Sequence, residues 1–256
     1  MKYFVVSDVH SFYTPLKTAL DNAGFDPENE NHTLISCGDL FDRGDESEQV
    51  LDYIMSLPRK ILVRGNHESM LMELFFRKRT ASSCDQHNGT IKTIFDLGGA
   101  FKQGFADDYK NNMFLLRRNK KLLEYFSLLI DYYETDNYIF VHSWVPTTRD
   151  SNGDITYLNY KEADARSWEN ARWVNPFKEY IYMKDMGESL GKTIVFGHWH
   201  TAEGHARFHN DGIANITLRH YRNGFNNCDI FHEDGIIGLD ACTVISGKVN
   251  CLVVED

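Results

Sequence analysis

Five short polar fragments, far apart along the chain, constrain its fold more than any other feature. Each fragment carries carboxylate, amide or imidazole side chains, and each comes directly after a short apolar run. In α/β folds the ligand-binding residues follow the carboxyl ends of strands, where several loops meet at one edge of a sheet. We therefore expect one shared site, built from Ser7-Asp8-Val9-His10, Gly38 to Gly44, Gly65-Asn66-His67-Glu68, Val141-His142 and Gly197-His198-Trp199-His200.

The first quarter of the chain alternates between strand and helix patterns. Apolar runs predict strands over Tyr3 to Val6, Thr33 to Ser36 and Lys60 to Val63. Between them, helical spacing and an early proline predict helices over Pro15 to Ala23 and Glu46 to Leu57. This alternation is typical of a parallel βαβαβ sheet.

The middle of the chain has a weaker pattern. A helix is expected over Glu68 to Arg79. It is followed by a glycine-interrupted segment up to about Asn112, in which Thr90 to Leu97 favours a short helix. We expect an insertion of helices and loops here that could cover the site. Leu122 to Ile130 predicts a further helix, and Tyr138 to Val141 predicts a strand that ends at His142.

The last third is rich in strand patterns. Thr193 to Phe196 predicts a strand that ends at Gly197-His198, and three more are expected over Gly212 to Leu218, Gly235 to Asp240 and Lys248 to Val254. We expect these strands to form a second sheet packed on the first. Arg219 to Glu233 is polar and aromatic without a clear period, so a loop is expected there.

Composition excludes several classes of protein. The chain has 256 residues, 42% of them hydrophobic, and no Pro/Ser/Gly-rich linker, so we expect a single domain over residues 1–256. Lys and Arg number 27 against 37 Asp and Glu, and the net charge of −10 opposes binding of a long nucleic acid. The apolar run at Tyr3 to Val6 is too short for a signal peptide or a membrane span, which favours a cytoplasmic protein without a membrane partner. The 5 cysteines contain no C-x-x-C pair, so no disulfide framework or zinc ribbon is indicated.

The residue types in the fragments are those of a dinuclear metal site. Asp8 and His10 alternate at the end of a strand, so both side chains can face one cation. Asp39 has two oxygens and can bridge to a second cation, whose ligands would be completed by Asn66, His142 and His198. Mixed carboxylate, amide and imidazole ligation suits Mn²⁺, Fe or Zn²⁺ better than Ca²⁺. Two metals about 3.5–4 Å apart would acidify a bridging water for in-line attack on phosphorus, so phosphoester hydrolysis is indicated.

With these motifs the chain resembles the calcineurin-like metallophosphoesterases, and within them the phosphoprotein phosphatase family of serine/threonine phosphatases, including its bacterial and phage members. The resemblance runs from Asp8 to about His200, with a weaker similarity over residues 236–252. It implies an α/β fold with a two-sheet β-sandwich core flanked by helices and a helical and loop insertion near residues 80–120. It also implies a metal-dependent phosphomonoester hydrolase, most typically acting on phosphoserine or phosphothreonine in proteins, or on a small phosphoester.

The resemblance also implies a role for each polar residue of the fragments. The first-metal ligands would be Asp8, His10 and Asp39, and the second-metal ligands Asp39, Asn66, His142 and His198. His67 would be the general acid, Asp42 the carboxylate that orients it, and Arg43 the first arginine that clamps phosphate. The second clamping arginine would be Arg172, with Arg166 as the alternative. His200 follows the Gly-His-x-His pattern of the broader family and would bind the first metal or support a ligand.

Two departures from the family pattern stand out. Ser7 and Ser11 replace the glycines that usually flank the first motif, which leaves the ligands intact but can alter the turn. Ser143-Trp144 replaces a small residue and glycine after His142, which predicts a bulkier wall near the second metal.

Two other functions are open. A symmetrical dinucleoside polyphosphate hydrolase, acting for example on diadenosine tetraphosphate, has a similar Phe196-Gly197-His198-Trp199 motif. Those hydrolases tend to lack an aspartate at the position of Asp42 and to have Asp in place of Glu68, so the phosphatase is favoured. A non-catalytic scaffold of the same fold would be expected to have lost some of these side chains, and here all are present.

Overall fold

Two sheets form the centre of the molecule in its computed structural model. The structure describes residues 1–77, 79–99, 106–149, 151, 155–209 and 227–256. Within these residues the first sheet has the strand order β12-β1-β2-β3-β4, and the second has the order β10-β11-β9-β6-β5. The first comprises β1 (Lys2–Val6), β2 (His32–Ser36), β3 (Lys60–Val63), β4 (Leu129–Ile130) and β12 (Cys251–Glu255). The second comprises β5 (Tyr133–Glu134), β6 (Tyr138–Phe140), β9 (Thr193–Phe196), β10 (Phe231–Glu233) and β11 (Ile236–Gly238).

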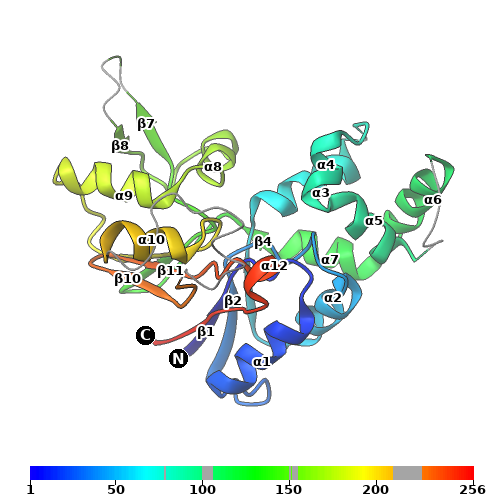
Figure 1. The fold of residues 1–256 in the computed structure, drawn as a ribbon, viewed down its shortest axis with the longest axis horizontal. Helices are drawn as coiled ribbons and strands as arrows, with labels where there is room; N and C mark the ends of the chain where they lie inside the picture. Colours follow the sequence, from blue (N-terminus) through cyan, green and yellow to red (C-terminus); the bar gives the residue numbers. More distant parts are fainter. Residues whose placement is uncertain (78, 100–105, 150, 152–154, 210–226) are drawn as a thin grey trace.

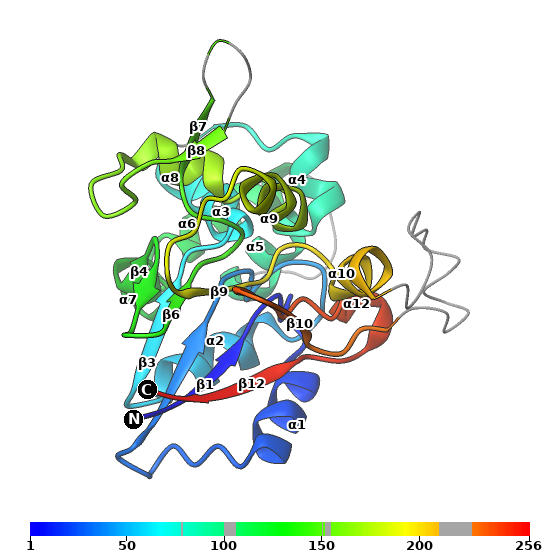
Figure 2. The ribbon, with the colours of Figure 1, turned by 90° about the vertical axis from the view of Figure 1, so that its left-hand side faces the viewer.

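The sheets are parallel where they carry the polar fragments. β1, β2, β3 and β4 run parallel, as do β6, β9 and β11, and the antiparallel pairs lie at the edges. Figure 2 shows β3, β2, β1 and β12 side by side. The expected parallel βαβαβ unit is therefore confirmed, and its loops leave from one edge of the sheet.

Alternate side chains of the central strands enter different cores. Phe4 and Val6 of β1 point to the helices outside the first sheet, whereas Tyr3 and Val5 point to the second sheet. On β9, Val195 meets those residues between the sheets, and its neighbours Ile194 and Phe196 face outward. Since successive strand residues face opposite sides, both faces of each sheet must be covered, and the core is a sandwich of two sheets between helical layers.

Helices cover the outer face of each sheet (Figures 1 and 2). Buried residues of α1 (Tyr13–Ala23), α2 (Ser47–Ser56), α5 (Thr90–Gly98) and α7 (Lys120–Leu128) belong to the core outside the first sheet. The second sheet is covered by α8 (Ala165–Ala171), α9 (Pro176–Asp185) and α10 (Thr201–Phe208). A separate hairpin of β7 (Thr147–Arg149) and β8 (Ile155–Tyr157) lies beyond α8. The expected fold class is confirmed.

The predicted insertion near residues 80–120 is mainly helical. After α3 (Asn66–Phe76) come α4 (Ser83–Asn88), α5 and α6 (Ala106–Leu116), with Gly89 ending α4 in the left-handed conformation. Ile94 and Leu97 of α5 and Met113 and Leu116 of α6 join the core outside the first sheet. The insertion is therefore packed as part of the domain.

Three predictions about elements were wrong. The last strand was expected in the second sheet, but β12 pairs antiparallel with β1, with Leu252 opposite Val5, because strand partners are chosen by contacts that local periodicity does not encode. The predicted Leu122 to Ile130 helix ends at Leu128, and the next two residues form β4 beside β3. The loop expected to end at Glu233 contains β10, which pairs with β11. The strand expected over Gly212 to Leu218 and residues 219–226 lie outside the described residues.

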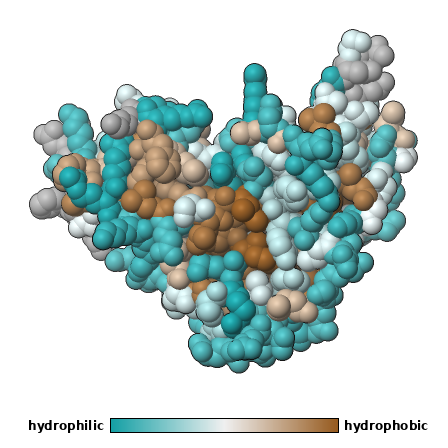
Figure 3. Space-filling model, turned by 180° about the vertical axis from the view of Figure 1, so that it is seen from behind, coloured by the Kyte–Doolittle hydropathy of each residue, from teal (hydrophilic) through white to brown (hydrophobic). Residues whose placement is uncertain are grey.

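The surface is mostly hydrophilic. Seen from behind, its broadest hydrophobic area lies near the centre of the face, with smaller hydrophobic patches toward the upper left and the right (Figure 3). Among the described residues, no helix has both the length and the apolar character that a membrane span requires.

Candidate metal centre

The loops that follow five parallel strands meet around the carboxylate of Asp39. Its Oδ2 lies 3.9 Å from Nε2 of both His10 and His67, and 3.5 Å from Nε2 of His142. Two groups of potential metal-binding side chains share Asp39, namely His10-Asp39-His67 and Asp39-His142-His198. The five fragments expected to form a shared site are thus brought together, with Asp39 at the centre.

Backbone strain is concentrated in these loops. Among the described residues, eight other than glycine have positive φ, and all except Cys242 belong to the loops of the site. They are Asp8, His10, Ser11, Asp39, Asp42, Arg43 and His198. Left-handed backbone is unfavourable for such residues and is typically retained where function or tight packing requires it. Asp8 and His10 therefore reach the site from a strained loop and not, as expected, from alternating positions of an extended strand.

Ser11 shows how the chain tolerates the loss of a family glycine. Its φ is 60°, a conformation that glycine adopts without cost. Its hydroxyl oxygen lies 2.9 Å from that of Ser47 in α2, so the side chain forms a buried hydrogen bond that glycine would lack. Ser7 also contributes, because its hydroxyl donates to Asp8 Oδ2 at 2.6 Å.

Two glycines permit the close approach of the loops. A Cβ atom on Gly65 would lie 2.1 Å from Asp39 Oδ1, and one on Gly197 would lie 2.1 Å from Asp8 Oδ2. Such distances are far below van der Waals contact. Any larger residue at either position would displace a central carboxylate.

Backbone carbonyls orient two imidazoles toward Asp39. His10 Nδ1 lies 3.0 Å from the carbonyl oxygen of Phe41, and His142 Nδ1 lies 2.8 Å from that of Cys37. A carbonyl oxygen can only accept, so each Nδ1 carries the hydrogen and each Nε2 keeps its lone pair. Burial holds the pKa of both histidines below the usual range, which keeps these lone pairs available to a metal.

Three buried carboxylates of the site interact electrostatically. Asp8, Asp39 and Asp240 are each 4% exposed or less. Burial raises the pKa of Asp8 well above its usual value, and the charges of Asp240 and Asp39 raise it further. Asp39 is also buried, but the surrounding imidazoles, led by His142, bring its pKa below the usual range. The oxygens and imidazole nitrogens of the site fit a divalent ion such as Mn²⁺, Fe²⁺ or Zn²⁺.

Asn66 and His198 complete the second group of donors. The Asn66 amide lies 2.8 Å from His142 Nε2, and rotating it by 180° lets its nitrogen donate to Asp39. The backbone N–H of His198 donates to Asp8 Oδ2 at 2.8 Å, which connects the two sheets. Burial, followed by the nearby His142, lowers the pKa of His198 to about 3, so its imidazole is neutral.

His67 and Asp42 form a buried pair. Nδ1 of His67 lies 2.7 Å from Asp42 Oδ2, which leaves Nε2 facing Asp39. Thr90 and Thr93 of α5 donate to the two oxygens of Asp42, each at 2.7 Å. Burial lowers the pKa of His67, but Asp39 and Asp42 outweigh it and leave the pKa above its usual value. The inserted helix therefore orients the carboxylate that orients His67.

The guanidinium of Arg43 lies against the first group of donors. Its Nη1 lies 2.9 Å from His10 Nε2, and its Nη2 lies 3.2 Å from His67 Nε2. The Nε2 atoms of His10 and His67 thus lie beside a positive charge. Arg43 is also close enough to contact an anionic ligand at the same centre.

The two candidate clamping arginines occupy different environments. Arg172, at the end of α8, is 2% exposed and donates to Glu169 Oε2 at 2.8 Å and to Asp131. Its charge contributes to the lowered pKa of His142, although burial is the main cause, so the guanidinium lies near the site. Arg166 lies six residues earlier, in the first turn of α8, and is exposed.

His200 lies apart from both groups of donors. It is the residue before α10, its side chain is 37% exposed, and Nε2 lies 3.8 Å from Asp240 Oδ2. Neither group of donors around Asp39 includes it, and the positive φ of His198 (63°) interrupts the extended segment that the sequence predicted. Its predicted role as a ligand stays a prediction. The Asp240 carboxylate beside it is also one of the charges that act on Asp8.

Glu68 is the functional residue that sequence reasoning used least. It is 1% exposed, and its oxygens accept from the backbone N–H groups of Asp39, Leu40 and Gly65 at 2.8–2.9 Å and from the Tyr125 hydroxyl at 3.1 Å. It therefore joins the loops that follow β2 and β3. The signal was present in the motif, since glutamate three residues after Gly65 forms a capping arrangement at the start of α3. Asp240, Thr90 and Thr93 had no such signal.

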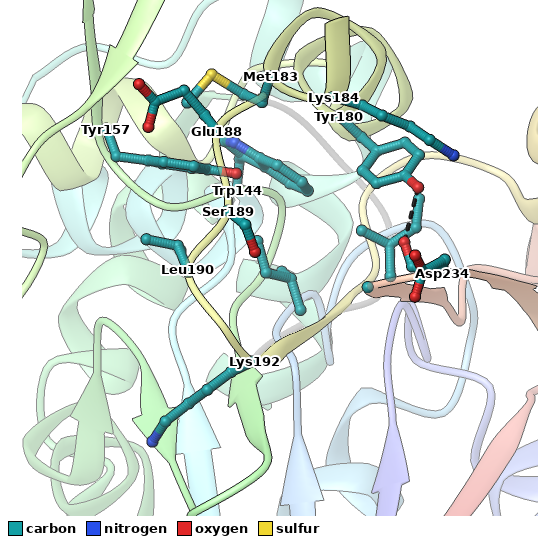
Figure 4. Close-up of a pocket in the computed structure, with 13 residues that line it drawn as sticks. Trp144, Tyr157, Tyr180, Met183, Lys184, Glu188, Ser189, Leu190, Lys192 and Asp234 are labelled. Atoms are coloured by element: carbon teal, nitrogen blue, oxygen red, sulfur yellow. Dashed lines mark hydrogen bonds between the residues drawn. The ribbon is translucent and has the colours of Figure 1, made fainter. Parts of the chain in front are cut away.

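Trp144 does not form the expected wall near the second metal. It is 1% exposed and packs in the core outside the second sheet. The centroid of its ring lies 6.3 Å from that of Phe196. On its other side it lines a cavity of about 210 Å³ with Tyr157 and Tyr180, and the Tyr180 hydroxyl donates to the carbonyl of Asp234 at 2.7 Å (Figure 4). Two other tryptophan rings lie beside His198, that of Trp199 at 5.8 Å between ring centroids and that of the 47% exposed Trp173 at 6.3 Å.

The fold and the arrangement around Asp39 define a class of protein. A family model described as calcineurin-like phosphoesterase matches residues 1–202, and the chain belongs to this family. Serine/threonine-protein phosphatase 2 of Escherichia coli K12 is 42% identical over 72 residues, which cover 28% of this chain and 32% of that protein. The symmetrical bis(5'-nucleosyl)-tetraphosphatase of Pectobacterium atrosepticum is 38% identical over 76 residues, which cover 29% of this chain and 26% of that protein. The matched region thus spans about a third or less of each relative.

A structural comparison agrees with the fold. A crystal structure of a cold-active protein tyrosine phosphatase superposes with a TM-score of 0.55 at 16% identity, over 99% of this chain and 73% of that one. At this identity the similarity concerns the fold alone.

Proposed function

We propose that this protein is a metal-dependent phosphomonoester hydrolase acting on phosphoserine or phosphothreonine in proteins. The observation that carries the proposal is the buried His67-Asp42 pair directed at Asp39, which is shared by two groups of metal-binding side chains. The similarity to serine/threonine-protein phosphatase 2 supports the choice of substrate. In keeping with the net charge of −10, no long nucleic acid is expected as a partner. A cytoplasmic location is part of the proposal.

The proposed cofactors are two divalent ions, with manganese as the first candidate and iron or zinc as alternatives. Asp8, His10 and Asp39 would hold one ion, and Asp39, Asn66, His142 and His198 the other. Bound there, the ions would supply an acidified water and neutralise charge on the phosphoryl oxygens.

The protein's own residues supply the remaining steps. His67, protonated with the help of Asp39 and Asp42, holds a proton at Nε2 and gives it to the leaving oxygen. Asp42 accepts the Nδ1 hydrogen throughout and keeps the ring in place. Arg43 and Arg172 would hold the phosphoryl oxygens, because a planar guanidinium matches two of them at once. Glu68 maintains the loop that positions Asp39.

A second function is favoured by a specific observation. The similarity to the symmetrical bis(5'-nucleosyl)-tetraphosphatase is nearly equal in identity and length to that of the phosphatase. A dinucleoside polyphosphate hydrolase is therefore the alternative proposal. The presence of Asp42 beside His67 supports the phosphatase.

The test compares both substrates on one preparation. The protein is stripped of metal, reloaded with Mn²⁺, and assayed with a phosphothreonine peptide and diadenosine tetraphosphate, with His67→Asn as the control variant. Peptide turnover that is lost in the variant is the expected result. Preference for the dinucleotide would replace the proposal with the alternative, and absence of turnover of both would refute both.

A further inference from the structure

A groove opens beside the candidate centre, between α3 and α8. It encloses about 520 Å³ and is lined by arginines from both sides, Arg64 before α3, Arg77 after it and Arg166 on α8. Met72 and the 52% exposed Phe76 form its apolar part. The groove therefore combines cationic and apolar surface, which is unusual in a chain with a net charge of −10.

Glu169 connects the groove to the candidate centre. Its Oε2 accepts from Arg172 at 2.8 Å and from the Ser69 hydroxyl at 3.0 Å, and Ser69 lies two residues after His67 on α3. Its Oε1 accepts from Trp173, whose ring faces His198. A substrate segment leaving the phosphate site past Arg172 would therefore enter the groove.

The arginines of the groove differ in their partners. Arg77 donates to Glu73 at 3.1 Å. For Arg64 and Arg166, no carboxylate within ion-pair distance is found in the described part of the chain, and the buried Nε of Arg64 has no hydrogen-bond partner there. Glu169 also lines the groove, but its carboxylate is already used by Arg172, Ser69 and Trp173. Two guanidinium groups in this groove thus have no ion-pair partner among the described residues, and the nearby Asp164 acts on Arg166 only at longer range.

We propose that this groove binds an acidic side chain of the phosphoprotein substrate, close in sequence to the phosphorylated residue. The inference rests on the proposed function and extends it to the substrate's sequence. A guanidinium and a carboxylate pair through two parallel hydrogen bonds, and Arg64 and Arg166 offer such donors on the two sides of the groove. Met72 and Phe76 provide apolar contact for the aliphatic part of a glutamate side chain.

The experiment uses phosphothreonine peptides in which one glutamate is moved through an alanine background on both sides of the phosphorylated residue. For the wild-type protein we expect kcat/KM to rise about tenfold at one position or two adjacent ones, as for a hydrogen-bonded charge pair. In Arg166→Ala the ratio between the acidic and the neutral peptide should fall to near one. Arg166→Glu should reverse the preference toward a lysine peptide. Arg118→Ala, an exposed arginine of the loop between α6 and α7, is the matched control and should keep the ratio.

Each contrary outcome identifies what is wrong. Two outcomes would overturn the proposed role of the groove while leaving the phosphatase proposal in place. One is that the wild-type protein hydrolyses all peptides at equal rates, and the other is that the ratio between acidic and neutral peptide is unchanged in Arg166→Ala. An equal loss on both peptides in Arg166→Ala would make this residue a phosphate clamp and would also overturn the groove. If p-nitrophenyl phosphate is hydrolysed but no phosphopeptide is, the proposed function fails and this inference fails with it.

Discussion

The two groups of donors that share Asp39 differ in what already neutralises them. In the group of His10 and His67, the Arg43 guanidinium contacts both imidazoles at 2.9 and 3.2 Å. In the group of His142 and His198, both imidazoles are held neutral by burial, and their neighbours are Asn66 and the Asp8 carboxylate. The first group thus combines metal-binding side chains with residues suited to substrate, and the second consists of metal-binding side chains alone. The comparison indicates that the group of His10 and His67 takes part in the reaction of the substrate, whereas the group of His142 and His198 serves to hold metal.

The largest effect is expected where the two groups meet. Asp39→Asn keeps the shape but removes the shared negative charge, so both groups should lose affinity for a divalent ion. We expect kcat to fall by about a thousandfold or more, equivalent to about 4 kcal/mol. Metal content by elemental analysis and kcat with a phosphothreonine peptide measure the effect. Asp45→Asn is the control, because Asp45 is exposed and lies in the same loop, between β2 and α2. A variant that retained two ions per chain and full activity would contradict the role of Asp39.

A second change tests the group of His10 and His67 alone, through the partner of His67. Asp42→Asn should lower kcat by about 10²–10⁴-fold, because an amide cannot stabilise the protonated His67. Metal content should stay unchanged, since Asp42 contacts His67 and two threonines and not the other donors. The loss should be much smaller with p-nitrophenyl phosphate, whose leaving group needs no proton. Equal losses on both substrates would show that Asp42 does not act through a general acid.

Metal binding measures the difference between the groups directly. Because the Arg43 guanidinium contacts Nε2 of His10, a proposed ligand of the first ion, we expect stripped protein to bind Mn²⁺ in two steps with affinities about tenfold or more apart. Arg43→Ala should narrow the gap by strengthening the weaker step, with Arg118→Ala as the control. Calorimetric titration supplies both constants. Identical Mn²⁺ binding constants in wild type and Arg43→Ala would show that Arg43 does not make the two groups of donors different.

The smallest effect is expected at the inserted helix. Thr93→Val removes one donor to Asp42 without changing side-chain shape, and Thr90→Val removes the other. Each should lower kcat about tenfold or less and cost about 1–3 kcal/mol of unfolding free energy, because a buried carboxylate oxygen loses its partner. In an Asp42→Asn background the loss of kcat should nearly vanish. Thr33→Val, at a buried position near the start of β2, is the control for stability. If the Thr→Val and Asp42→Asn losses of kcat were additive, the threonines would not act through Asp42.

Sequence reasoning reached the centre because its residues sit in short local motifs. The alternation of apolar runs and polar loops predicted β1, β2, β3, β6 and β9, and with them the edge at which Asp8, Asp39, Asn66, His142 and His198 meet. The same reasoning failed for geometry within the loops. It placed Asp8 and His10 on extended backbone, whereas both have positive φ.

The sequence by itself determined the family, the order of the central strands along the chain and the identity of the polar residues at their ends. Only the tertiary structure decided that β12 joins β1, that Thr90 and Thr93 hold Asp42 across 48 and 51 positions, and that Arg64 and Arg166 line one groove. The physical reason is the range of the interactions. Strand and turn preferences act over a few neighbouring residues and repeat with a readable period, whereas a hydrogen bond or ion pair between distant segments leaves no periodic trace in either of them.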